Sequence, residues 1–206
     1  MADDVRPNHS PNLRTQEATD FPAREKRLTV AEFDRMAEAG LLNEPGKHEL
    51  WDGRIMMTPP PGAPHMDAES RINEALVLGI AQAGLRAQFR VVPGGGLQIG
   101  ECDLRQPDLM VVRLPINRER RPSGDGVVLV IEVAHSSLPD DLGEKRGKYA
   151  AAGVAEYWVV DVQHALLHVF RGPHAGDYPP AQQLAAEASV SPLFAPGLSF
   201  AVADLV

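Results

Sequence analysis

The 206-residue sequence contains one cysteine, Cys102, and aromatic residues make up only 5% of it. A single cysteine excludes an intramolecular disulfide and a zinc site built from several cysteines. No stretch approaches the roughly 18 consecutive apolar residues of a membrane span. The first residues lack the basic segment and following apolar segment of a secretory signal. We therefore expect a soluble, cytoplasmic protein with no membrane partner.

Basic residues are also scarce, since 20 lysines and arginines stand against 28 aspartates and glutamates, a net charge of −8. Only Lys26, Lys47, Lys145 and Lys148 are lysines. A chain with this balance repels phosphate over most of its surface, which excludes an indiscriminate nucleic-acid coat protein. Any contact with DNA or RNA must then be local, through a patch of arginines or through bridging metal ions.

The overall composition is that of a globular protein, with 44% hydrophobic and 23% charged residues. The length suits one domain. Residues 1–28 are polar, interrupted by proline and without apolar periodicity. We therefore expect a flexible tail over 1–28, followed by a single domain over 29–206.

Local patterns predict strands interleaved with three helices. Thr29-Val30-Ala31-Glu32 has the form of a capping box at a helix start, and Asp52-Gly53 between two apolar runs predicts a β-hairpin. Two further helices are expected at 65–83 and 142–152, and strands at 86–92, 97–99, 108–112, 127–133, 156–161 and 165–170. This order predicts an α/β or α+β fold with a mixed sheet, whose central strand is the uninterrupted apolar run at 127–131.

Two carboxylates lie at the ends of predicted strands. Pro107-Asp108 opens one strand, and Glu132 closes the most apolar one. Carboxylates that meet at one end of a sheet repel each other unless a cation lies between them. Mg²⁺ prefers one or two carboxylates, a backbone carbonyl and waters. The alternative is structural, with Asp108 capping a loop and Glu132 paired with an arginine.

Lys145 lies four residues from both Asp141 and Tyr149, which places the three side chains on one helix face. If that face is turned towards the two carboxylates, Lys145 would orient an attacking water or neutralise charge on a phosphate. The alternative is an exposed Asp–Lys pair with Asp141 as the N-cap of the helix. Tyr149 is equally well explained by core packing.

Three further features suit contact with a substrate. Glu69 lies on the predicted inward face of the second helix, an unusual place for a carboxylate. His65, at the start of that helix, would contact a substrate phosphate or cap the helix. The loop 113–121 holds four arginines and one glutamate, so it is either a local positive patch for a nucleic-acid backbone or a solvated loop. Its candidate contact residues are Arg118, Arg120 and Arg121.

Several motifs, in the right order over about residues 29–206, resemble the Uma2 family. They are Glu132-Val133-Ala134-His135-Ser136-Ser137-Leu138, Asp141 to Lys145, Tyr149 to Asp161, Glu49 to Gly53, Pro60 to His65, Gln106-Pro107-Asp108 and Ser191 to Leu198. Uma2 proteins are assigned to the PD-(D/E)XK nuclease fold. The resemblance therefore implies a restriction-endonuclease-like mixed sheet flanked by helices, with an N-terminal helix and hairpin.

The resemblance also implies an activity, the metal-dependent hydrolysis of phosphodiester bonds in DNA. Asp108, Glu132 and the backbone carbonyl of Val133 would hold Mg²⁺ or Mn²⁺, and a metal-activated water would attack the phosphate. Lys145 would stabilise the charge that develops. Glu49 on the first hairpin matches the acid that completes such sites, and Glu69 is its competitor.

Two positions depart from the parent pattern. Ala134 stands where the parent pattern has a lysine, and His135 stands where relatives often have an acid. These departures keep open a second hypothesis, an inactive nucleic-acid-binding or assembly module with the same fold. We expect DNA as the partner, with RNA or a single strand as alternatives, and by analogy a homodimer.

Overall fold

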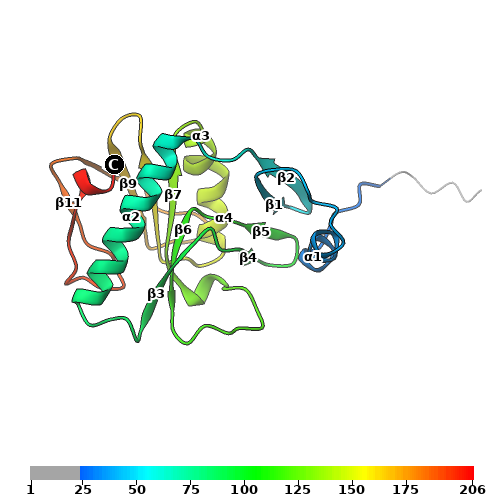
Figure 1. Cartoon of the computed structure of the whole chain (residues 1–206), viewed down its shortest axis with the longest axis horizontal. Coiled ribbons are helices and arrows are strands. Elements are labelled where there is room, and N and C mark those ends of the chain that lie inside the picture. Colours follow the sequence, from blue (N-terminus) through cyan, green and yellow to red (C-terminus); the bar gives the residue numbers. More distant parts are fainter. Residues whose placement is uncertain (1–23) are drawn as a thin grey trace, which may run out of the picture.

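In the computed structural model, the described residues are 24–206 (Figure 1). Most of the expected tail at 1–28 therefore lies outside the described residues. Its last residues contact the domain, because Leu28 donates a backbone hydrogen bond of 2.9 Å to the carbonyl of Gly53. None of the helices over 24–206 combines the length and the apolar character needed to cross a membrane.

A six-stranded mixed sheet forms the centre of the structure, in the order β10-β9-β8-β7-β6-β3. The strands are β3 (Phe89–Pro93), β6 (Leu109–Arg113), β7 (Val127–Ala134), β8 (Glu156–Asp161), β9 (Leu166–Arg171) and β10 (Gln182–Ala185). Only β7 and β8 run parallel among its neighbouring pairs. Parallel neighbours need a crossover connection, which here consists of α3 (Leu138–Asp140), η2 (Asp141–Lys145) and α4 (Arg146–Ala151).

Helices cover both faces of this sheet. The long helix α2 (Ala63–Gln82) crosses one face (Figure 1) and buries Ile72, Leu76 and Ile80 against it. On the other face, Tyr149 and Ala150 of α4 pack in a second apolar cluster. All eight residues of β7 are buried, as its continuous apolar sequence predicts for a central strand.

A smaller four-stranded sheet lies beside the central one, in the order β2-β1-β5-β4. Its strands are β1 (Lys47–Trp51), β2 (Arg54–Thr58), β4 (Leu97–Ile99) and β5 (Asp103–Arg105). The hairpin between β1 and β2 turns at Asp52 and Gly53, whose φ angles of 46° and 77° fit the two-residue turn predicted there.

The N-terminal helix α1 (Val30–Glu38) packs on this smaller sheet through Val30 and Phe33. Its capping box is complete: the side chain of Thr29 accepts the backbone N–H of Glu32, and the side chain of Glu32 accepts that of Thr29. The predicted helix start is thus confirmed. The rest of the chain forms η1 (Gly124–Gly126), β11 (Ser189–Val190), β12 (Phe200–Ala201) and η3 (Val202–Asp204).

The structure confirms the predicted mixed sheet flanked by helices, and it differs from the sequence predictions at several elements. The strand expected from residue 86 begins at Phe89, after a turn. The third helix is not one continuous helix over 142–152, because it begins at Leu138 and contains a turn of π-helix at Asp141–Lys145. The strand expected from residue 108 begins at Leu109, so Asp108 lies just outside it. The three-residue strand β5 was not predicted, since it is too short to show a period.

Close packing of η1 against the end of α4 yields a stability prediction. A β-carbon on Gly124 would lie 1.5 Å from the carbonyl oxygen of Ala152, whereas one on Gly126 would meet no atom within 4 Å. We expect Gly124→Ala to lower the free energy of unfolding by about 1–3 kcal/mol or more, because overpacking has costs of this size. Gly126→Ala should change the same free energy by less than about 1 kcal/mol. Urea unfolding of the two variants checks this, and equal stabilities would contradict it.

Candidate active site

A cavity of about 320 Å³ lies at the end of the central sheet where β6 begins and β7 ends. The smaller sheet, the start of α2 and the crossover segment supply its other walls. Residues from five separate parts of the chain therefore meet in it: Lys47, Glu49 and Trp51; Thr58 to Gly62 with Pro64 and His65; Gln106 and Asp108; Glu132 and His135 to Ser137; Asp140 and Lys145.

The two carboxylates expected to meet at the end of the sheet do so. The β6–β7 register pairs Leu109 with Ile131, and continuing it by one pair sets Asp108 opposite Glu132. The Oδ2 atom of Asp108 accepts the backbone N–H of Val133 at 2.8 Å. Asp108 is 3% exposed and Glu132 is 1% exposed, so both are removed from water, which favours their neutral forms unless partners compensate.

Glu132 is compensated from the crossover segment, and not by an arginine. Its Oε1 lies 3.2 Å from Nζ of Lys145 and accepts a 2.6 Å hydrogen bond from Oη of Tyr149. Burial raises the pKa of Glu132 to about 8, although Lys145 acts in the opposite direction. Burial would lower the pKa of Lys145, but the charges of Glu132 and Asp141 raise it, so the lysine stays charged.

Asp141 holds the other side of the same lysine. Its Oδ1 lies 2.8 Å from Nζ of Lys145, and its Oδ2 accepts a 2.6 Å hydrogen bond from Oγ of Ser137. Asp141 is 1% exposed, so the pair is not the exposed surface pair of the alternative hypothesis. The helix face with Asp141, Lys145 and Tyr149 is turned towards Glu132.

Asp108 is compensated by Lys47 and His65. The ammonium of Lys47 forms an ion pair with Oδ1 of Asp108, and Nε2 of His65 lies 3.3 Å from the same oxygen. Burial alone would raise the pKa of Asp108, but His65 and Lys47 hold it well below its usual range. The contact with Asp108 also raises the pKa of His65. Asp108 therefore carries its negative charge at neutral pH.

Lys47 was missed at the level of sequence. The alternation of side chains along a strand could have indicated it. Residues 47, 49 and 51 lie on the same face of β1, so Lys47 faces the same side as Glu49, which was already a candidate. All three side chains line the cavity. A lysine on a strand is ordinarily solvated, and nothing local to Lys47 indicates that it reaches Asp108.

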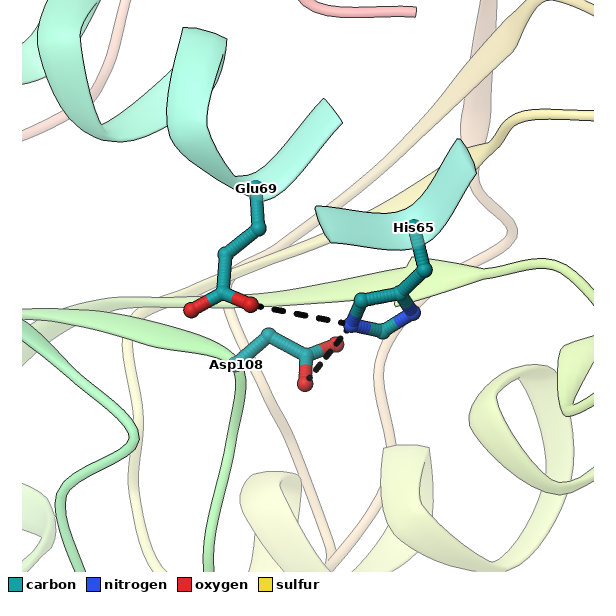
Figure 2. Close-up of side chains that lie close together, drawn as sticks. All are labelled: His65, Glu69 and Asp108. Atoms are coloured by element: carbon teal, nitrogen blue, oxygen red, sulfur yellow. Dashed lines mark ion pairs between the residues drawn. The ribbon is translucent and has the colours of Figure 1, made fainter. Parts of the chain in front are cut away.

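The two candidate acids, Glu49 and Glu69, both lie near Asp108 but differ in their partners. Glu49 is 3% exposed, and its oxygens accept the backbone N–H of Gln106 at 2.6 Å and Nε1–H of Trp51 at 2.8 Å. Glu69 projects from α2 towards Asp108 (Figure 2) and is half-buried, with His65 as its charged neighbour at 3.8 Å. Burial and the charge of Asp108 raise the pKa of Glu69.

The candidate arginines are not brought to this cavity. Arg118, Arg120 and Arg121 line a separate shallow cavity together with Asp34 and Glu38 of α1. Their loop follows the end of β6 and precedes β7, so it lies at the opposite end of these strands from Asp108. Arg121 forms two hydrogen bonds of 2.8 and 2.7 Å with Asp34.

Ala134 and His135 take different places at the end of β7. Ala134 is fully buried in the apolar cluster that contains Tyr149. His135 is exposed and lines the cavity.

Comparisons with known proteins identify similar chains. The family model described as "Uma2: Putative restriction endonuclease" matches residues 30–203. A crystal structure of a "putative nuclease belonging to DUF820 from Anabaena variabilis ATCC 29413" matches with a TM-score of 0.65 and 18% identity, over 86% of this chain and 97% of that one. This similarity shows a common fold. No curated protein matches the sequence.

The type IIG restriction endonuclease BpuSI matches over 50% of this chain and 11% of its own, with 14% identity and a TM-score of 0.33. A TM-score at that level does not establish a common fold.

The hydrogen bond between Tyr149 and Glu132 yields a pH-dependent prediction for the metal-free protein. Above pH 8, Glu132 is ionised, and a hydrogen bond to a charged acceptor contributes about 1.5–3 kcal/mol, against about 1 kcal/mol for a neutral one. We therefore expect the destabilisation by Tyr149→Phe, measured by urea unfolding with a chelator present, to be larger at pH 9 than at pH 6.

Tyr157→Phe is the matched control, because Tyr157 is also fully buried and donates to a neutral acceptor, the backbone carbonyl of Asp141, at 3.0 Å. Its cost should be the same at both pH values. If Tyr149→Phe lowers the free energy of unfolding by less at pH 9 than at pH 6, this hydrogen bond does not favour the ionised carboxylate.

Proposed function

This chain belongs to the Uma2 family, and from that premise we propose that it is a metal-dependent DNA endonuclease that hydrolyses phosphodiester bonds. The observation that carries the proposal is the meeting of Asp108 and Glu132 in one cavity, each buried and each beside a lysine ammonium. Two carboxylates removed from water at neighbouring positions cost free energy. A site that binds cations and phosphate accounts for that cost.

The donor atoms at this position fit a hard divalent cation. The carboxylates of Asp108 and Glu132 are oxygen ligands, and the backbone carbonyl of Val133 follows Glu132 at the end of β7. Mg²⁺ and Mn²⁺ prefer such ligands and retain several waters. A bound ion of this kind supplies a Lewis acid and lowers the pKa of its water.

The two lysines have separate roles in this proposal. Lys145 is the more buried, with a 14% exposed side chain between Glu132 and Asp141, and it neutralises charge that develops on the phosphate. Lys47 has a 28% exposed side chain on β1 of the smaller sheet and contributes a second positive charge. Glu49 has a positioning role. Its two oxygens accept hydrogen bonds from the backbone N–H of Gln106 and from the side chain of Trp51, and so hold these two residues in the cavity wall.

Cleavage of supercoiled plasmid in the presence of Mg²⁺ or Mn²⁺ tests the proposal. We expect the wild type to nick the plasmid, and Asp108→Asn, Glu132→Gln and Lys145→Met each to reduce the rate by at least about 100-fold. Asp125→Asn, at an exposed position of η1 at the far end of β7, is the matched carboxylate control. Lys26→Met, on the exposed surface, is the lysine control.

The outcomes separate the possible functions. Equal nicking by all variants would identify a contaminant and refute the assignment of the site. Wild type that binds nucleic acid but cleaves none, with Mg²⁺ or with Mn²⁺, would favour an inactive binding module. Competition by duplex DNA, single-stranded DNA and RNA then identifies the preferred substrate.

We also propose that the active form is a homodimer, because two copies of a one-site chain can cleave both strands of a duplex in a single binding event. Sedimentation velocity of the full chain is expected to give a species of two chains. A monomer at all concentrations, with or without duplex DNA, would refute this part of the proposal.

A further inference from the structure

Three potential metal ligands converge beside the Asp108–Glu132 pair, on the side covered by α2. His65 and Glu69 lie four residues apart and therefore on one face of α2, and both point at Asp108 (Figure 2). Nε2 of His65 lies 3.3 Å from Oδ1 of Asp108 and 3.8 Å from Oε2 of Glu69. One donor atom from each of the three lies within 4.8 Å of the other two.

Asp108 is compensated by Lys47 and by the N–H of Val133, whereas His65 and Glu69 are not satisfied by their own contacts. Nε2 of His65 is buried, and no described residue offers it a well-aligned hydrogen bond, although it is close to Asp108. Glu69 is half-buried beside a second carboxylate, and within residues 24–206 His65 is its one ion-pair partner. Two carboxylates held this close repel each other unless a positive charge lies between them, and His65 occupies that position. The ammonium of Lys47 compensates Asp108 and forms no ion pair with Glu69.

We infer that His65, Glu69 and Asp108 form a second divalent-cation site, which shares Asp108 with the Asp108–Glu132 site. This inference rests on the proposed function only where it concerns the Asp108–Glu132 site. The second site is defined by the positions of His65, Glu69 and Asp108 themselves. A site with an imidazole nitrogen favours Mn²⁺, Co²⁺ or Zn²⁺ over Mg²⁺, whereas a site of oxygen ligands accepts Mg²⁺. His65 is thus the residue that makes the two sites differ in metal preference.

The stoichiometry of Mn²⁺ binding tests this inference without any cleavage assay. The free-Mn²⁺ signal in electron paramagnetic resonance is titrated against the metal-free full chain, with no nucleic acid present. We expect two Mn²⁺ per chain in the wild type, one of which Mg²⁺ displaces readily. His65→Gln and Glu69→Gln should each weaken one of the two sites by at least about 10-fold, and Asp108→Asn should weaken both.

Controls separate a local effect from a general loss of structure. Glu74→Gln, an exposed carboxylate on the same helix α2, should retain two ions. Electron spin-echo spectroscopy should show coupling between Mn²⁺ and an imidazole nitrogen in the wild type and equally in His135→Gln, which removes the other histidine that lines the cavity. That measurement tests the site even if His65→Gln fails to fold.

Each contrary outcome is specific. One ion per chain, lost in Glu132→Gln but unchanged in His65→Gln and Glu69→Gln, would overturn the second site and leave the proposed function standing. Two ions retained in both of these variants, without nitrogen coupling, would also overturn it. One ion with nitrogen coupling that survives Glu132→Gln would support the site of His65 and contradict the metal site of the proposed function.

Discussion

The burial of Asp108 and Glu132 at the end of the central sheet is the constraint on which the rest of this structure depends. Moving a carboxylate out of water costs several kcal/mol after relaxation, and two neighbouring carboxylates also repel each other. The chain offsets these costs from four directions. The smaller sheet contributes Lys47, α2 contributes His65, the crossover contributes Lys145 and Tyr149, and β7 contributes the N–H of Val133. The elements that frame the cavity are therefore the elements that supply these partners.

The position of the crossover segment follows from the parallel pairing of β7 with β8, which requires a connection that begins directly after Glu132 and Ala134. Its π-helical turn, Asp141–Lys145, is a local distortion of a kind often found at functional sites. Further ion pairs hold this segment against the smaller sheet. The fully buried Arg105 lies 3.2 Å from Glu144, the residue before Lys145, and Lys148 contacts Asp52 and Asp103. Lys145 is thus held in a connection that is fixed at several points.

What the sequence predicts and what it leaves open depend on the range of the interactions involved. The capping box of Thr29, the Asp52-Gly53 turn and the buried strand β7 are encoded by neighbouring residues, and all three are present. The pairing of Asp108 with Glu132 could be predicted because both residues lie at strand ends. Strand β5 could not, because three residues are too few to show a period. The contact between Lys47 and Asp108 could not either, because it joins residues 61 positions apart. Local sequence also does not distinguish Glu49, whose oxygens are both hydrogen-bonded, from Glu69, whose one ion-pair partner among residues 24–206 is His65.

The replacement of the expected strand lysine by Ala134 has a physical explanation in this packing. Ala134 lies two residues after Glu132, on the same face of β7, and is fully buried in the apolar cluster with Val130 and Tyr149. A lysine at this position would bring four methylenes and a charge into this buried apolar cluster. The ring is retained, and its hydroxyl donates to Glu132, while the ammonium comes from Lys145 on the crossover to the same oxygen. Glu132 is therefore compensated by a hydroxyl and an ammonium that both come from the crossover, and the small residue at 134 keeps this end of β7 apolar.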